Sequence, residues 1–211
     1  CADLLKAGLV DLSLIPVAVI PQIPHAEIIS DFCIGANGKV NTVMLYSDCP
    51  LNEIKSIALD YQSRTSVMLT KILVVNYWKI KVSFKETNEG YINAIKGKDA
   101  GLVIGDRAFD LNGKFPYQYD LSEEWFKFTK LPFVFACWVA NKPLSEHFKH
   151  QFSSALKFGV EEKKKAIACF EQKVNSTVDV KSYLNKDISY VLDTEKRKAL
   201  KLFLELGSAL V

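Results

Sequence analysis

A hydroxyl-rich turn is the first group of side chains in this sequence that could bind a ligand. It follows a strand predicted over residues 56–60 and precedes an apolar helix predicted over residues 67–78. The first N–H groups of a helix have no partner within it and carry a partial charge of about +0.5, so hydroxyls beside them would complete a seat for a carboxylate or a phosphate. The alternative, that Ser63 or Thr65 only caps the helix, stays open. The turn consists of Ser63, Arg64, Thr65 and Ser66.

Three acidic residues are the next candidates. The apolar run 102–106 ends in Asp106, as a buried strand does when it delivers an acid to the edge where α/β folds bind ligands. Asp106 is therefore either a site residue or the cap of the following turn. Glu123 and Glu124 lie in the first turn of a helix predicted over 122–130, where acids stabilise the helix dipole by about 0.3–1 kcal/mol. That structural role explains the pair adequately.

Histidine, cysteine and glycine patterns give no further site. His25 lies in a loop or at a strand edge and His147 and His150 lie on a solvated helix, and no H-x-x-x-H or Cys/His spacing supports a metal. The five cysteines are odd in number and form no C-x-x-C pair, which favours reduced thiols in a cytoplasmic protein. Neither a G-x-S-x-G elbow nor a G-x-G-x-x-G fingerprint occurs, so hydrolase and dinucleotide-binding functions lack their motifs.

Length and composition are those of a globular protein with one domain or two small ones. The chain has 211 residues, of which 49% are apolar and 24% charged. Its net charge of +3 is small and its lysines are spread among acids, so nucleic acid is not an expected partner. No apolar stretch reaches the roughly 20 residues of a membrane span. The chain begins with Cys1 and shows no signal peptide, so we expect an amino-terminal piece to be absent from it.

The elements that must position these residues alternate between strands and helices. A turn predicted over 33–39 leads into a strand over 40–47, and the strand 132–140 is apolar enough to be buried on both faces. This order predicts an α/β fold of two lobes. After Asn141 we expect four helices whose apolar stripes cover one lobe. They span residues 145–158, 160–173, with a break near Gly159, then 179–184 and 194–206.

Five motifs, occurring in order along the chain, closely resemble the chorismate dehydratase family of the futalosine route to menaquinone. The similarity covers essentially the whole chain, and it is the co-occurrence in order that is specific. The motifs are NGKVNTVMLYS (37–47), DYQSRTS (60–66), IGDRA (104–108), YDLSEEW (119–125) and LPFVFACWVANK (131–142).

The resemblance implies a fold. It is the type II periplasmic-binding-protein-like fold, in which two α/β lobes are joined by two crossing hinge strands and hold a ligand in the cleft between them. Here the hinge strands would be 40–47 and 133–139. Lobe one would comprise residues 1–45 and 133–211, including the helical carboxyl-terminal segment, and lobe two would comprise residues 46–132.

The resemblance also implies an activity, the loss of water from chorismate to give 3-[(1-carboxyvinyl)oxy]benzoate. Such an enzyme is a carbon-oxygen lyase (a hydro-lyase) that works in the cytoplasm without metal or nucleotide cofactor, on a small-molecule substrate and without a membrane. A homo-oligomer is left open. The alternatives are the sister enzyme that cleaves cyclic dehypoxanthine futalosine to 1,4-dihydroxy-6-naphthoate, and a solute-binding protein that holds a small carboxylate without turning it over.

Nine site residues follow from the same resemblance. Thr42, where relatives commonly have serine, and Ser63 would be catalytic. The substrate-binding residues would be Asn41, Arg64, Thr65, Ser66, Asp106, Pro132 and Phe133. Two departures from the family pattern stand out: a Tyr-Leu-Asn-Thr-like motif at the start of relatives has no counterpart here, and Ser122 and Lys130 stand where glycine is common.

Overall fold

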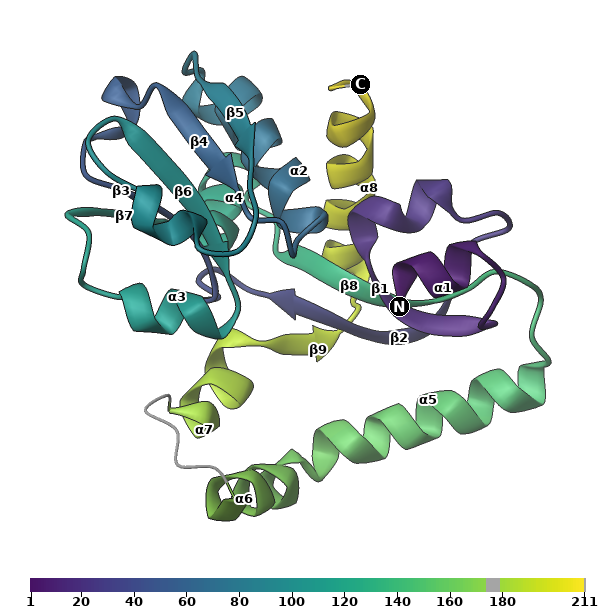
Figure 1. The fold of residues 1–211 in the computed structure, drawn as a ribbon. Helices are drawn as coiled ribbons and strands as arrows, with labels where there is room; N and C mark the ends of the chain where they lie inside the picture. The colour runs from purple at the N-terminus through teal and green to yellow at the C-terminus, as the bar shows by residue number, and fades with distance from the viewer. Residues whose placement is uncertain (174–178, 211) are drawn as a thin grey trace.

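The computed structural model describes residues 1–173 and 179–210, which form two β-sheets with helices packed around them (Figure 1). In these residues sheet A is antiparallel, in the order β1-β8-β2-β9, and sheet B has the order β5-β4-β6-β3-β7. In sheet B, β4 runs parallel to β5 and β6, whereas β3 is antiparallel to β6 and β7. The strands are β1 (Leu12–Pro16), β2 (Glu27–Ala36), β3 (Val43–Ser47), β4 (Ser56–Leu59), β5 (Ser83–Glu86), β6 (Asp99–Ile104), β7 (Tyr117–Asp120), β8 (Phe133–Ala140) and β9 (Ser189–Val191).

The helices cover the faces and ends of both sheets. Short 3₁₀ turns occupy Val17–Gln22, Leu51–Glu53 and Tyr91–Ala94. Two helices continue as π-helical segments, α2 into Leu73–Trp78 and α7 into Tyr183–Asp187. Among the described helices, none combines the length and the apolar character that crossing a bilayer requires. The α-helices are α1 (Ala2–Lys6), α2 (Thr65–Ile72), α3 (Asp106–Leu111), α4 (Leu121–Thr129), α5 (Glu146–Glu161), α6 (Lys163–Lys173), α7 (Val180–Ser182) and α8 (Thr194–Ser208).

Two local predictions are misplaced along the chain. The turn expected over 33–39 begins only after Ala36, because residues 33–36 pair with β8 and extend β2. The helix break expected near Gly159 lies three residues further on, at Glu162, since α5 continues to Glu161 and α6 begins at Lys163. A glycine within a helix costs only about 1 kcal/mol relative to alanine, which the rest of the helix can offset.

The chain passes between the sheets twice. It leaves sheet A after β2 and enters sheet B at β3, and it returns from α4 to β8. Asp120 ties the first passage to α4, because its carboxylate accepts the N–H groups of Val40 (2.8 Å) and Asn41 (2.7 Å) as well as those of Ser122 (3.0 Å) and Glu123 (3.1 Å). The division into lobes at residues 45/46 and 132/133 stays a prediction.

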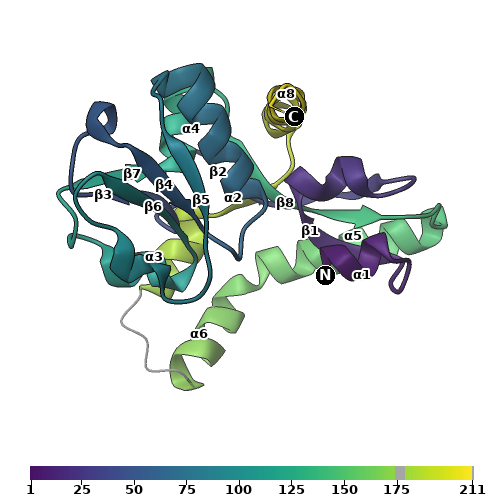
Figure 2. The same ribbon diagram turned by 45° about the horizontal axis from the view of Figure 1, so that its top comes forward.

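An aromatic cluster at the second passage packs α4, β8 and α8 together. The rings of Trp125 and Phe133 lie 5.4 Å apart, and Phe133 lies 5.2 Å from Phe203, both in edge-to-face geometry. All three side chains are buried. Helix α8 also contacts α2, so it lies against elements of both sheets, as Figure 2 shows in end-on view. Lys130 ends α4 with a φ of 63°, the left-handed conformation that glycine adopts most easily.

Candidate active site

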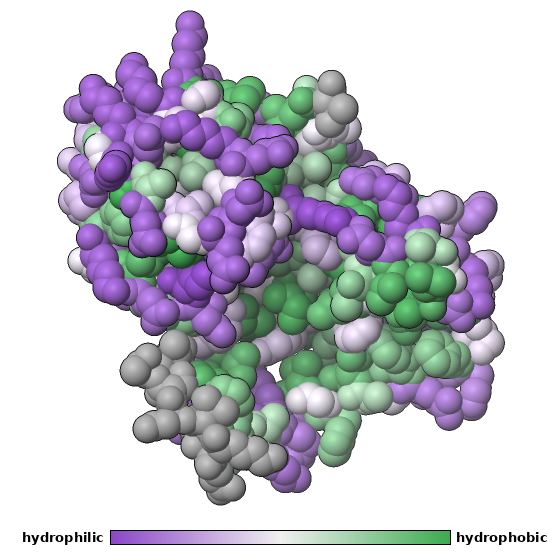
Figure 3. Space-filling model, in the orientation of Figure 1, coloured by the Kyte–Doolittle hydropathy of each residue, from purple (hydrophilic) through white to green (hydrophobic). Residues whose placement is uncertain are grey.

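A cavity of about 360 Å³ lies where the two sheets meet. Apolar residues of β1, β2 and β8 form one wall, and the end of β6 with the turn before α2 forms the other. In Figure 3 this junction is a recess with apolar surface between the upper-left and right-hand parts of the molecule. The polar residues that line the cavity are Thr42, Gln62, Ser63, Thr65, Ser66 and Tyr183.

The turn before α2 supplies hydroxyls and N–H groups to this cavity. Ser63 Oγ accepts the N–H of Ser66 (3.0 Å), so Ser63 does cap the helix, yet its own O–H proton remains available to donate. The hydroxyl of Ser66 and the N–H groups of Arg64 and Thr65 have no partner among the described residues. The turn can therefore both cap helix α2 and bind a ligand.

Thr65 joins the turn to sheet A. Its Oγ1 donates to the carbonyl of Phe135 in β8 (3.1 Å) and accepts the N–H of Ala18 (3.3 Å). Both capacities of the hydroxyl are then used within the protein. Thr65 thus positions the α2 terminus against the opposite wall of the cavity, and Ser63 and Ser66 are the better donors for a ligand.

Asp60 fixes the other end of the turn, although sequence reasoning assigned it no role. Its fully buried carboxylate accepts two hydrogen bonds from Nη2 of Arg107 (3.0 and 2.7 Å) and one each from the Tyr91 hydroxyl (2.9 Å), the Ile104 N–H (3.0 Å) and the Gln62 N–H (2.9 Å). These bonds join the end of β4 to the end of β6. The only signal in the sequence is an acid at the end of a predicted strand.

Thr42 reaches the cavity from the first passage between the sheets. Its Oγ1 lies 3.3 Å from the carbonyl oxygen of Val40 and 3.1 Å from the hydroxyl of Tyr183. Burial raises the pKa of Tyr183 above its ordinary value, and the nearby carboxyl groups of Asp106 and Asp187 act in the same direction against the opposing hydrogen bond with Thr42. Tyr183 was missed from the sequence, because nothing in a short helical segment near residue 183 indicates a cavity 140 residues away in the chain.

Five predicted site residues lie outside the lining of this cavity. Asn41 donates to Asp187 Oδ2 (2.9 Å), and Asp106 is exposed at the start of α3. Arg64 turns away to the carboxylate of Asp3, at 2.8 and 2.9 Å, and thereby lowers the pKa of that carboxyl. The remaining two take part in the aromatic core, as Pro132 accepts a hydrogen bond from Trp125 through its carbonyl and Phe133 is buried. Thr42, Ser63, Thr65 and Ser66 are the predicted residues that the structure brings together.

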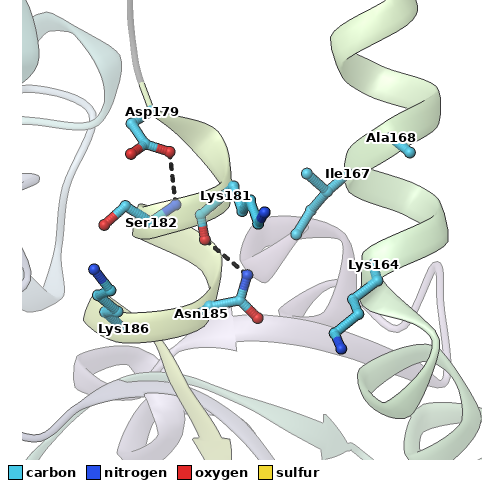
Figure 4. Close-up of a pocket in the computed structure, with 8 residues that line it drawn as sticks. All are labelled: Lys164, Ile167, Ala168, Asp179, Lys181, Ser182, Asn185 and Lys186. Carbon is cyan, nitrogen blue, oxygen red and sulfur yellow. Dashed lines mark hydrogen bonds between the residues drawn. The ribbon is translucent and has the colours of Figure 1, made fainter.

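A larger hollow of about 660 Å³ lies between α6 and α7 (Figure 4). Lys164, Lys181 and Lys186 line it, but their ammonium groups point in different directions. The carboxylate of Asp179 turns back to accept the N–H of Ser182 (2.8 Å). Without converging polar groups this hollow is a poor candidate for a specific site, so the cavity between the sheets remains the candidate active site.

Comparison with known proteins shows which family the chain belongs to. A family model described as menaquinone biosynthesis matches residues 1–209. The chain belongs to the menaquinone biosynthesis family. The chain is also 31% identical over 159 residues to the chorismate dehydratase of Thermus thermophilus. That match covers 66% of this chain and 57% of the relative, so the chain spans little more than half the relative's length.

Solved structures extend the family comparison to the fold. A protein from Archaeoglobus fulgidus matches with a TM-score of 0.72 and 18% identity over 99% of this chain and 83% of that one. A structure from Parabacteroides distasonis titled as an ABC transporter matches with a TM-score of 0.62 and 18% identity over 98% and 77%. These likenesses concern the fold alone, and they agree with the periplasmic-binding-protein-like arrangement expected from the sequence.

Proposed function

We propose that this member of the menaquinone biosynthesis family provides the substrate cleft of a chorismate dehydratase, a carbon-oxygen lyase. The observation that carries the proposal is the cavity between the sheets, which combines an apolar wall with unpartnered hydroxyl and N–H donors at the start of α2. The similarity to the Thermus thermophilus chorismate dehydratase supports the same substrate. A dicarboxylate with a hydrophobic ring fits such a cavity chemically.

In this cleft the turn before α2 binds a carboxylate of the substrate. The hydroxyls of Ser63 and Ser66 and the N–H group of Thr65 are its donors, and the helix dipole adds a favourable field. The ring packs against the apolar wall near Phe135. The other predicted substrate-binding residues, Asn41, Asp106, Pro132 and Phe133, reach a ligand only if the cavity is wider than it is in this structure.

The reaction requires little covalent chemistry from the protein. The electron pair of a ring C–H bond forms the new ring double bond, the neighbouring C–O bond breaks, and the oxygen leaves as water. Aromatisation of the ring supplies the driving force. The cleft then acts by holding the substrate in a reactive orientation and by aiming fixed dipoles at the developing charge.

Incubation of the full-length protein with chorismate tests the proposal. We expect the diene absorbance of chorismate to disappear while the substituted benzoate appears in chromatography. Tight binding of chorismate without product would refute the dehydratase and favour a small-carboxylate binding protein. Turnover of cyclic dehypoxanthine futalosine in place of chorismate would favour the sister enzyme.

Thr42 provides a second test with a matched control. Thr42→Ala removes a hydroxyl that lines the cavity, whereas Thr42→Ser keeps it and restores the residue common in relatives. Thr42 Oγ1 lies 3.1 Å from the Tyr183 hydroxyl and 3.3 Å from the Val40 carbonyl, and a hydrogen bond between neutral groups contributes about 0.5–1.5 kcal/mol, so we expect turnover to fall roughly 2- to 13-fold in Thr42→Ala. Turnover of Thr42→Ser should stay close to that of the unmodified protein. Equal turnover in all three proteins would contradict the assignment of the cleft.

A further inference from the structure

Tyr183 lies in the cavity in a position that substrate binding alone does not explain. It comes from the segment after α7, yet its side chain lines the cavity formed by sheets A and B. The ring is held from the side of sheet B by Phe109, with centroids 5.5 Å apart and planes at 87°. Its hydroxyl lies 3.1 Å from Thr42 Oγ1. A phenol is thereby fixed beside the hydroxyl that the proposed function places against the substrate.

The hydrogen bonds around Thr42 indicate which way the phenol proton points. Thr42 has one hydroxyl proton, and the Val40 carbonyl at 3.3 Å can only accept it. Both bonds can form together only if Tyr183 donates its proton to Thr42 Oγ1. In this structure the Tyr183 hydroxyl is therefore a donor to Thr42 Oγ1 at the cavity wall, and a substrate oxygen that displaces this contact would receive the same proton.

Loss of a hydroxyl from the substrate requires such a donor, because hydroxide leaves far less readily than water. The described residues that line the cavity include no histidine, cysteine, lysine, arginine, aspartate or glutamate. Their polar side chains are one amide, four aliphatic hydroxyls and the Tyr183 phenol. A phenol, with an ordinary pKa of about 10, is by far the most acidic of these groups.

We propose that Tyr183 is a catalytic acid that protonates the departing hydroxyl of the substrate, an inference that rests on the proposed dehydratase function. The ring C–H electron pair becomes the new double bond, the C–O bond breaks, and the oxygen takes the Tyr183 proton to leave as water. The ring proton is taken up by a carboxylate of the substrate or by water and returns to the phenoxide, so the protein is unchanged after each turnover. Burial keeps the phenol protonated until this step, because it raises the pKa of Tyr183.

The test compares Tyr183→Phe with Tyr190→Phe in the full-length protein. Tyr190 is half-buried in the neighbouring β9, and its hydroxyl donates to the Leu184 carbonyl (3.2 Å) in the same helical segment that carries Tyr183. Removing this hydroxyl loosens the segment without touching the cavity. General acid catalysis contributes about 10²–10⁴-fold, so we expect kcat to fall by at least about 100-fold in Tyr183→Phe, with KM within about threefold. Tyr190→Phe should keep most of its turnover.

A pH profile separates proton donation from packing. Replacement of Tyr183 by 3,5-difluorotyrosine keeps the ring and its contacts but makes the phenol more acidic. We expect kcat of this variant to begin its fall on the alkaline side of the pH profile (the basic limb) at a lower pH than kcat of the unmodified protein. A structural role of the ring would leave the limb where it was.

Three results would refute the role of Tyr183 as a catalytic acid. If chorismate is dehydrated but Tyr183→Phe retains kcat within about fivefold, the catalytic acid is refuted and the dehydratase proposal stands. If Tyr190→Phe loses as much kcat as Tyr183→Phe, or if the difluorotyrosine leaves the basic limb unmoved, the role of Tyr183 is structural. If the unmodified protein leaves chorismate intact, the proposed function and the role of Tyr183 fail together.

Discussion

Replacing Asp60 by asparagine removes a buried negative charge on which four donor groups converge. The side chain of Asp60 is 0% exposed, and that of its ion-pair partner Arg107 is 29% exposed. Each carboxylate oxygen accepts one of the two bonds from Arg107 together with at least one further donor. Asparagine has nearly the same shape but presents an N–H₂ group on one side, so the donors on that side face another donor.

The expected loss of stability is large. Breaking a buried ion pair by removing one partner costs about 3–5 kcal/mol, and partial exposure of Arg107 reduces this. Two or more hydrogen bonds to a charged acceptor are also lost or weakened, at about 1.5–3 kcal/mol each, although these terms overlap with the first. We expect the free energy of unfolding to fall by about 3–4 kcal/mol. For a chain of this size that corresponds to a lowering of Tm by roughly 6–16 °C.

Asp99→Asn is the matched control in the same sheet. The side chain of Asp99 is 47% exposed and pairs with Lys85 at 3.1 Å. Such a pair contributes less than about 1 kcal/mol. Urea denaturation followed by tryptophan fluorescence measures both variants, and turnover of chorismate measures whether the turn before α2 has moved. A loss below about 1 kcal/mol in Asp60→Asn, or one equal to that of Asp99→Asn, would refute the anchoring role.

Three further predictions concern the turn, the helical layer and the thiols. Ser63→Ala should lower chorismate turnover roughly 10- to 150-fold, because a hydroxyl that donates a hydrogen bond to a substrate carboxylate is lost, while the circular dichroism spectrum stays unchanged. Unaltered turnover would show that Ser63 does not bind the substrate. Asp193→Ala removes the cap of α8 and the partner of the buried ammonium of Lys196 (3.0 Å), so we expect unfolding to become easier by about 2–4 kcal/mol in denaturation. Partial burial raises the pKa of Asp193, but the hydrogen bonds and charge of Lys196 outweigh it and hold the pKa below 3.8. The gap between variant and unmodified protein should therefore be complete above pH 3.8 and close as the pH falls further; a gap that persists in acid would contradict the ion pair. Burial raises the pKa of Cys33 and of Cys137 to about 12, so both thiols should resist alkylation at pH 8 while the two exposed cysteines react, as peptide mapping would show.

Much of the local structure was predictable because it depends on neighbours in sequence. The strand, turn and helix around residues 56–78 follow from an apolar run, a hydroxyl-rich break and a second apolar run, and the structure has β4, the turn and α2 in those places. The apolar segment expected to be buried on both faces is β8, which lies between β1 and β2. The acids at the start of α4 were predicted to be structural, and Glu124 accepts hydrogen bonds from Trp78 (2.9 Å) and Lys127 (2.8 Å).

The direction in which individual side chains point was not predictable from the sequence. Arg64 and Ser63 are adjacent in the turn, yet Arg64 binds Asp3 outside the cavity and Ser63 faces into it. Asp106 was expected at the end of a strand, but β6 ends at Ile104. Gly105 follows with a φ of 68°, and Asp106 begins α3 with its side chain exposed. The backbone dihedral angles at these residues decide which way each side chain points, and sequence patterns do not determine those angles.

The sequence by itself determined the family, the alternation of strands and helices and the hydroxyl-rich turn before α2, because motifs and hydrophobic periodicity act over a few residues. Only the tertiary structure decided that Tyr183 meets Thr42 across 141 positions and that Asp60 gathers donors from three segments. These contacts join elements that are distant in the chain and adjacent only after both sheets have formed. The Tyr183 contact depends on how the passage from β2 to β3 packs against the segment after α7, and the Asp60 contacts depend on how β4, β6 and the turn at Tyr91 pack together. No local pattern encodes that packing.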